Sequence, residues 1–168
     1  TRNQPRKGIT TDLKQEYRRP IDKLAFEHQF CLFHFKKSVN EKIRKHVKEH
    51  NLPEEKIKEY KSYLPELYDV FNLENMNEVQ KIFDNLRKNI NKFPKVIQEI
   101  LNNKFLPYGK NLTKFIDDFK IESTSNKIER IFEDLSPKHI KKKFKTIRGF
   151  LSRFNLKLKG WDSHNAIY

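Results

Sequence analysis

Residues 29–35 have the sequence Gln29-Phe30-Cys31-Leu32-Phe33-His34-Phe35, which decides the fold class of this 168-residue chain. The run is short, apolar and aromatic, as is typical of a buried strand. A second short strand is predicted at Gly8-Ile9-Thr10-Thr11-Asp12, where β-branched residues precede an acid. Between the two runs, apolar residues recur at helical spacing: Leu13, Tyr17, Ile21 and Leu24. Residues 1–35 are therefore predicted to form a strand, a helix and a strand.

The period of the apolar residues changes to 3.6 after this run, and it stays there from Lys36 to Ile121. Such a period indicates amphipathic helices. The apolar positions include Val39, Ile43, Val47, Ile57, Tyr60, Leu64, Leu67, Val79, Ile82, Phe83 and Leu86. Only Pro107-Tyr108-Gly109 resembles a true turn. Residues 36–121 are predicted to be an all-helical subdomain.

A third region, residues 122–168, begins with cap-forming residues at Ser123-Thr124-Ser125-Asn126. An apolar stripe follows at Ile128, Ile131, Phe132 and Leu135, and Pro137 is expected to begin a second, basic helix. The whole chain is thus predicted to be α/β but mostly helical.

The charge of the chain favours an anionic partner. Lys and Arg number 36 against 22 Asp and Glu, which gives a formal charge of +14. From Ser136 to Gly160 there are nine Lys or Arg and no acid. An ordinary solvated helix face usually mixes both signs, so this segment favours contact with DNA phosphates. The bases expected to make that contact are Lys138, Lys141, Lys142, Lys143, Lys145, Arg148 and Arg153.

The compartment follows from what the sequence lacks. One cysteine excludes an internal disulfide, and neither a secretion signal nor a membrane-spanning run of about 20 apolar residues is apparent. We expect a cytoplasmic protein of a prokaryote, associated with the nucleoid and not with a membrane.

Two acids could carry chemistry. Asp12 ends a predicted strand, where α/β proteins often place ligands, although it could also cap the helix that follows. Glu129 lies three residues after Asn126, which fits a capping box and needs no further role. Considered together, paired carboxylates suit Mg²⁺ or Mn²⁺, which promote phosphodiester cleavage.

Three motifs resemble insertion-sequence transposases of the DDE type. They are Thr-Asp-Leu at 11–13, Cys-x-x-His at 31–34 with its Gln29 and aromatic flanks, and Thr-Ser-Asn-x-x-Glu at 124–129 before a basic helix. In that family an RNase H-like core carries two Asp and one Glu that bind two divalent metals. A helical insertion often separates the second Asp from the Glu.

The resemblance implies a role for each matching residue. Asp12 would be the second catalytic acid and metal ligand, and Glu129 the third, with residues 36–121 as the insertion. The first acid would lie on an earlier strand, so this chain would be the C-terminal portion of a transposase. Its partners would be DNA, the missing N-terminal half and further transposase copies. The fold would be a partial RNase H-like core, its last strands and C-terminal helices interrupted by the insertion.

Two alternatives to an active transposase remain open. The first is a non-catalytic DNA-binding remnant or a regulator of an intact transposase. The second is a helical scaffold whose positive charge meets an acidic protein or RNA.

Cys31 and His34 have two interpretations. With His46 and His50 they form a spacing that superficially resembles a zinc finger, and His46 to His50 also matches a His-x-x-Glu-His metalloprotease pattern. Residues three apart in a strand point to opposite faces, which argues against zinc. The transposase resemblance instead implies that Cys31 and His34 are a fold signature, which packs the core and orients neighbouring groups.

Overall fold

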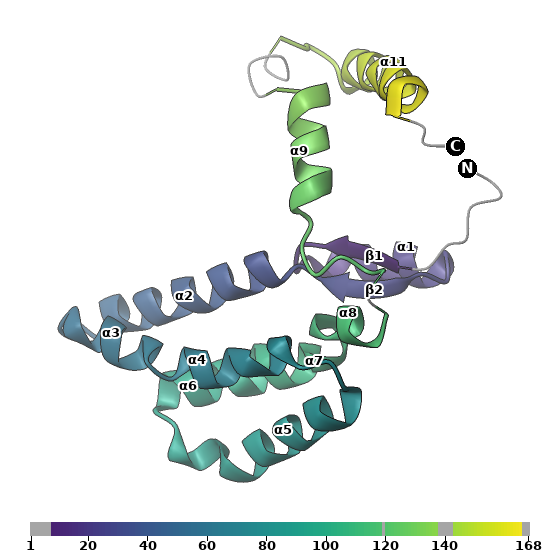
Figure 1. The fold of residues 1–168 in the computed structure, drawn as a ribbon. Coiled ribbons are helices and arrows are strands. Elements are labelled where there is room, and N and C mark those ends of the chain that lie inside the picture. The colour runs from purple at the N-terminus through teal and green to yellow at the C-terminus, as the bar shows by residue number, and fades with distance from the viewer. Residues whose placement is uncertain (1–7, 119, 138–142, 166–168) are drawn as a thin grey trace. The chain divides into compact units, whose positions relative to one another are not determined.

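The computed structural model describes residues 8–118, 120–137 and 143–165. It divides into two compact units, one ending at Thr124 and the other beginning at Ser125. The first unit holds a small parallel sheet and a block of helices, and the described part of the second unit holds two helices (Figure 1).

The sheet consists of β1 (Gly8–Thr11) and β2 (Glu27–Phe30), which run parallel with Gly8 opposite Glu27 and Thr11 opposite Phe30. The strand predicted before Asp12 is therefore confirmed. The connection between the strands passes through a 3₁₀ turn, η1 (Gln15–Tyr17), and helix α1 (Arg18–Lys23). Ile21 is the buried residue of α1.

The predicted second strand is wrong beyond Phe30, because helix α2 (Leu32–Glu49) begins within the aromatic run. The Cys31 N–H donates to the Thr11 carbonyl at 2.8 Å, and the Cys31 carbonyl accepts from the Phe35 N–H at 3.0 Å. Cys31 is thus both the end of the sheet and the N-cap of the helix. The buried positions of α2 continue the helical period from the run into the next turns: Leu32, Phe35, Val39, Ile43 and Val47.

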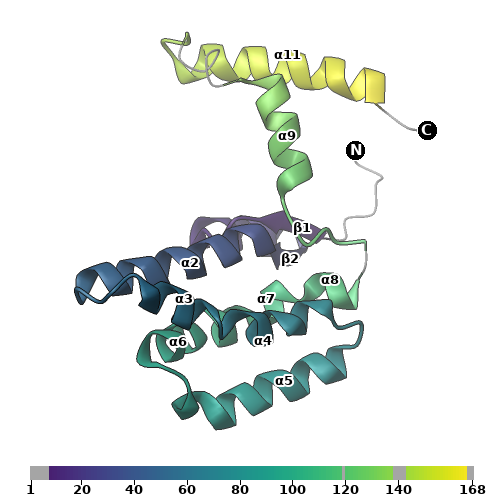
Figure 2. The same ribbon diagram turned by 60° about the vertical axis from the view of Figure 1, so that its left-hand side comes forward.

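A block of helices follows α2 and folds back on it (Figure 2). Its elements are α3 (Glu55–Lys61), α4 (Leu64–Tyr68), η2 (Asp69–Asn72), α5 (Met76–Asn89), η3 (Ile90–Lys92), α6 (Lys95–Ile100), η4 (Leu101–Phe105), α7 (Leu106–Leu112) and α8 (Lys114–Asp117). Aromatic rings dominate the core of the block. The ring of Phe105 lies 5.7 Å from that of Phe35 and 5.5 Å from that of Phe83, between centroids.

The turn predicted at Pro107–Gly109 is wrong, because these residues lie inside α7. The π-helical segment η4 joins α6 directly to α7, and Pro107 falls in the first turn of α7, where a missing N–H is tolerated. Gly109 is needed for close packing. A Cβ at this position would lie 2.8 Å from Phe83 Cζ on α5.

Gly109→Ala should therefore destabilise the first unit, although alanine is the better helix former by about 1 kcal/mol. The added methyl group would push the Phe83 ring out of a filled core, at a cost of about 1–3 kcal/mol. Urea unfolding followed by circular dichroism measures the change. Gly160→Ala is the matched control, because a Cβ there would have no neighbouring atom within 4 Å. A Gly109→Ala variant as stable as the wild type would contradict this packing.

The end of the first unit returns to the sheet. The Thr10 hydroxyl donates to the Glu122 carbonyl, and the Leu32 N–H donates to the Ser123 carbonyl at 2.9 Å. Gly8 makes room for this segment, because a Cβ there would lie 2.6 Å from Ile121 Cδ1. The segment 121–123 is thereby held beside β1 and the start of α2.

The second unit contains α9 (Asn126–Leu135) and α11 (Ile147–Asn165). The helix predicted after the cap residues is confirmed by α9. Thr146 caps the start of α11. Its hydroxyl accepts the Gly149 N–H at 3.1 Å, and its carbonyl accepts the Phe150 N–H at 3.2 Å. The two helices meet through the Phe132 and Phe154 rings, whose centroids are 5.6 Å apart. Across the residues that the structure describes, no helix is long and apolar enough to span a membrane.

Candidate functional site

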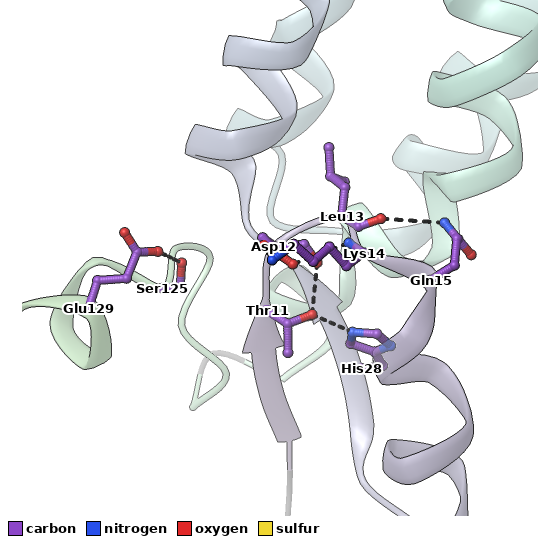
Figure 3. A network of polar contacts seen from close by, with 8 residues as sticks. All are labelled: Thr11, Asp12, Leu13, Lys14, Gln15, His28, Ser125 and Glu129. Atoms are coloured by element: carbon purple, nitrogen blue, oxygen red, sulfur yellow. Dashed lines mark hydrogen bonds and ion pairs between the residues drawn. The ribbon is translucent and has the colours of Figure 1, made fainter. Parts of the chain in front are cut away.

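Asp12 follows directly on β1, in the position that the sequence predicts (Figure 3). One carboxylate oxygen, Oδ1, accepts the Lys14 N–H at 3.2 Å, and the other lies 3.5 Å from Lys14 Nζ. This local turn is the usual reason for Asp at the end of a strand. Helix η1 begins at Gln15 with Lys14 as its N-cap, so Asp12 does not cap a helix. The Asp12 side chain is 29% exposed, which leaves it accessible for binding.

Thr11 connects Asp12 to His28 on β2. The Thr11 hydroxyl donates to the Asp12 carbonyl at 2.9 Å and lies 2.8 Å from His28 Nε2. Because the hydroxyl proton is used on the carbonyl, we assign the proton to Nε2, which then donates to Thr11. His28 is buried, and its carbonyl accepts from Asn111 Nδ2 at 2.8 Å. The imidazole therefore steadies the strand ends from which Asp12 projects.

Burial lowers the pKa of His28, and the nearby Arg18 charge lowers it further, while Asp22 opposes both. The unfolded chain thus takes up a proton near pH 6.5, whereas the folded chain does so only at lower pH. The contribution of His28 to the free energy of unfolding should be complete above about pH 6.5 and should fall as the pH drops below that value.

His28→Gln should flatten that decline, because an amide can still donate to Thr11 but does not titrate. The measurement is the free energy of unfolding in urea between pH 5 and 8. Burial and the neighbouring His50 also lower the pKa of His46, so part of the decline should remain in the variant. An unchanged pH dependence would show that His28 titrates alike in both states.

Gln29 flanks the Cys-x-x-His motif, and its role in the structure could not be predicted from the sequence. Its side chain is fully buried, and its amide bridges β2 to the end of the helical block. Nε2 donates to the Leu112 carbonyl at 3.1 Å, and Oε1 accepts the Phe115 N–H at 3.2 Å. A polar residue within an aromatic run was the available signal, but its partners lie more than eighty residues away in sequence.

Asp12 and His34 line one hollow of about 350 Å³, formed where β1 ends beside the first turns of α2. Cys31 is buried at the start of that helix. Since α2 begins at Leu32, the argument from strand geometry against zinc is wrong. His46 and His50 lie near the other end of α2, with ring centroids 4.2 Å apart. No group of three possible metal ligands is gathered among residues 8–118, 120–137 and 143–165.

Glu129 belongs to the second unit and is exposed on α9. The predicted capping box is wrong in register, since the N-cap of α9 is Ser125 rather than Asn126. The Glu129 N–H donates to the Ser125 carbonyl at 3.0 Å, and the Ser125 hydroxyl donates to the Glu129 carboxylate (Figure 3). The carboxylate is therefore steadied by the start of its own helix.

The predicted DNA-binding residues divide into two groups. Lys143, Lys145, Arg148 and Arg153 are all exposed in the second unit. Lys138, Lys141 and Lys142 lie outside the described residues. Exposed apolar residues interrupt the bases, and Ile147 in the first turn of α11 is 79% exposed.

A curated relative of this chain is the "Insertion element ISM1 uncharacterized 48.3 kDa protein" of Methanobrevibacter smithii. The two are 26% identical over 161 residues, which cover 96% of this chain and 40% of the relative. The similarity supports an insertion-sequence origin. This chain thus spans about two fifths of the length of the relative that it matches. No protein-family model matches it, and no solved structure matches it at a significant level.

Proposed function

We propose that this chain is part of a DDE-type transposase, which moves an insertion sequence by metal-dependent phosphodiester cleavage and strand transfer. The observation that carries the proposal is the position of Asp12, accessible at the carboxyl end of a strand in a parallel pair. The similarity to an insertion-element protein along nearly the whole chain supports it. The resemblance to DDE transposases implies that Asp12 lies in an RNase H-like core.

The donor chemistry of Asp12 fits a divalent metal. Carboxylate oxygens are preferred ligands of Mg²⁺ and Mn²⁺, and each Asp12 oxygen has further lone pairs beyond its contact with Lys14. Glu129 is proposed as a further ligand on the strength of the motif that it ends. When bound, the metal would supply Lewis acidity toward phosphate and water oxygens. Asp12 would hold it, and Thr11 and His28 would keep the strand end in place.

The exposed bases of the second unit are proposed to bind the DNA backbone. In this role each lysine or arginine that meets a phosphate displaces a counterion, so affinity falls steeply with salt. The part of the chain that can be tested directly is the described set, Lys143, Lys145, Arg148 and Arg153.

Changing these four residues to Gln should weaken duplex DNA binding and lower the magnitude of the salt slope by up to about 4. Fluorescence anisotropy with a labelled duplex between 50 and 300 mM KCl measures both. A matched variant changes four exposed lysines of the first unit to Gln: Lys58, Lys88, Lys92 and Lys95. Equal losses in the two variants would contradict a localised DNA contact. The absence of salt-dependent DNA binding would favour the scaffold alternative, in which the positive charge meets an acidic protein or RNA.

A further inference from the structure

The hollow beside Asp12 is built from two elements of the first unit. Asp12, Leu13 and Lys14 line it from the end of β1. The other wall is a single face of α2, on which Lys37, Ser38 and Glu41 follow His34 within two helical turns. Both walls therefore belong to one compact unit, and their geometry does not depend on the second unit.

The charges around the hollow favour an anion. Lys14 is 64% exposed, and Lys37 is also exposed, so both ammonium groups can reach a ligand. A third lysine, Lys104, lies behind the α2 wall, with Nζ 3.5 Å from the Ser38 carbonyl. Against these three cations stand two acids, Asp12 and Glu41. The positive charge of Lys104 also interacts with the Glu41 carboxylate, and it offsets part of that negative charge.

A divalent cation ligated by Asp12, His34 and Glu41 together is the competing occupant, because two carboxylates and one imidazole line the same space. Direct ligation by all three is disfavoured, since the described residues contain no set of three such groups close enough to share an ion. A phosphate group suits the site better, because it can accept from two ammonium groups at once.

We propose that this hollow binds a phosphate group of the DNA backbone, with Lys37 and Lys14 as its contacts. The inference rests on the proposed function, because it places DNA against Asp12. It adds a DNA contact in the first unit to the contact proposed for the exposed bases of the second unit. One phosphate held there would fix the register of the backbone beside the Asp12 carboxylate.

Lys37→Gln tests the proposal without disturbing the core, because Lys37 is exposed. Its duplex affinity should fall severalfold at low salt, and the magnitude of its salt slope should fall by about 1. Lys58→Gln is the matched control, an exposed lysine on α3 that lies outside the hollow. The same variants should be compared by titrating inorganic phosphate into the ¹⁵N-labelled protein, with the amide signals of Leu13, His34 and Ser38 as reporters.

The outcomes separate this proposal from the one on which it rests. Phosphate-induced shifts at the reporters, lost in Lys37→Gln, together with the lower salt slope would support the hollow as a DNA contact. No shifts, and a slope equal to that of Lys58→Gln, would overturn the hollow while DNA binding by the chain stands. Shifts in a wild type that does not bind DNA would overturn the DNA contact and indicate free phosphate as the ligand. Shifts with Mg²⁺ and none with phosphate would overturn the phosphate contact and would agree with the metal role proposed for Asp12.

Discussion

Asp12→Asn should abolish the Mg²⁺-dependent strand cleavage that we propose for this protein, with a loss of at least about a hundredfold. The substitution removes a negative charge from the proposed metal ligand and keeps its shape. The amide oxygen can still accept the Lys14 N–H that Oδ1 accepts now, so the turn after β1 should persist. Activity should therefore be lost without loss of stability, which a nicking assay and a urea titration measure side by side.

Glu129→Gln should give the same loss, and α9 itself supplies the matched control. Glu133→Gln changes another exposed acid one turn further along this helix and should leave cleavage unchanged. Undiminished cleavage by Asp12→Asn or by Glu129→Gln would remove that residue from the catalytic assignment. DNA binding without cleavage by the complete wild-type protein would favour the non-catalytic remnant or regulator instead.

Gln29→Leu should lower the free energy of unfolding by about 2–5 kcal/mol. Leucine fills the same space but leaves the Leu112 carbonyl and the Phe115 N–H without the partners they have now. Each buried polar group left without its hydrogen bond costs about 1–3 kcal/mol. Urea unfolding of the isolated chain measures the loss.

Gln80→Leu is the control for this substitution, because Gln80 is exposed on α5 and its amide donates to the neighbouring Asp84 side chain. Its effect should stay within about 0.5 kcal/mol. A Gln29→Leu variant that unfolds at the wild-type urea concentration would show that Gln29 does not join β2 to α7.

The sequence pattern predicted those elements whose structure depends on residues close together in the sequence. The β-branched residues before Asp12 predicted β1, and the apolar period after Lys36 predicted the helices. The aromatic run was ambiguous, since a largely apolar stretch of seven residues fits both a strand and the buried start of a helix. Contacts between distant residues decide where the strand ends and the helix begins. The Thr11 carbonyl accepts the Cys31 N–H at the end of the sheet, and the Ser123 carbonyl accepts the N–H of Leu32, the first residue of α2.

The candidate site shows the same difference between features set by neighbouring residues and features set by distant ones. The position of Asp12 could be predicted from its strand, whereas the partners of Gln29 are fixed only by tertiary packing. The N-cap of α9 was misplaced by one residue because Ser125 and Asn126 are both residue types that favour the N-cap position. The RNase H-like core, the metal and the roles of Asp12 and Glu129 stay predictions.

The hydrogen bonds between Gln29 and the α7–α8 junction have a consequence for the order of folding. They join residues more than eighty positions apart, so they close a very long loop, and closing it costs chain entropy. That cost falls once the intervening helices have packed and brought the ends together. We expect the helical block to fold first on its own local contacts, and the two-stranded sheet that carries Asp12 to form last.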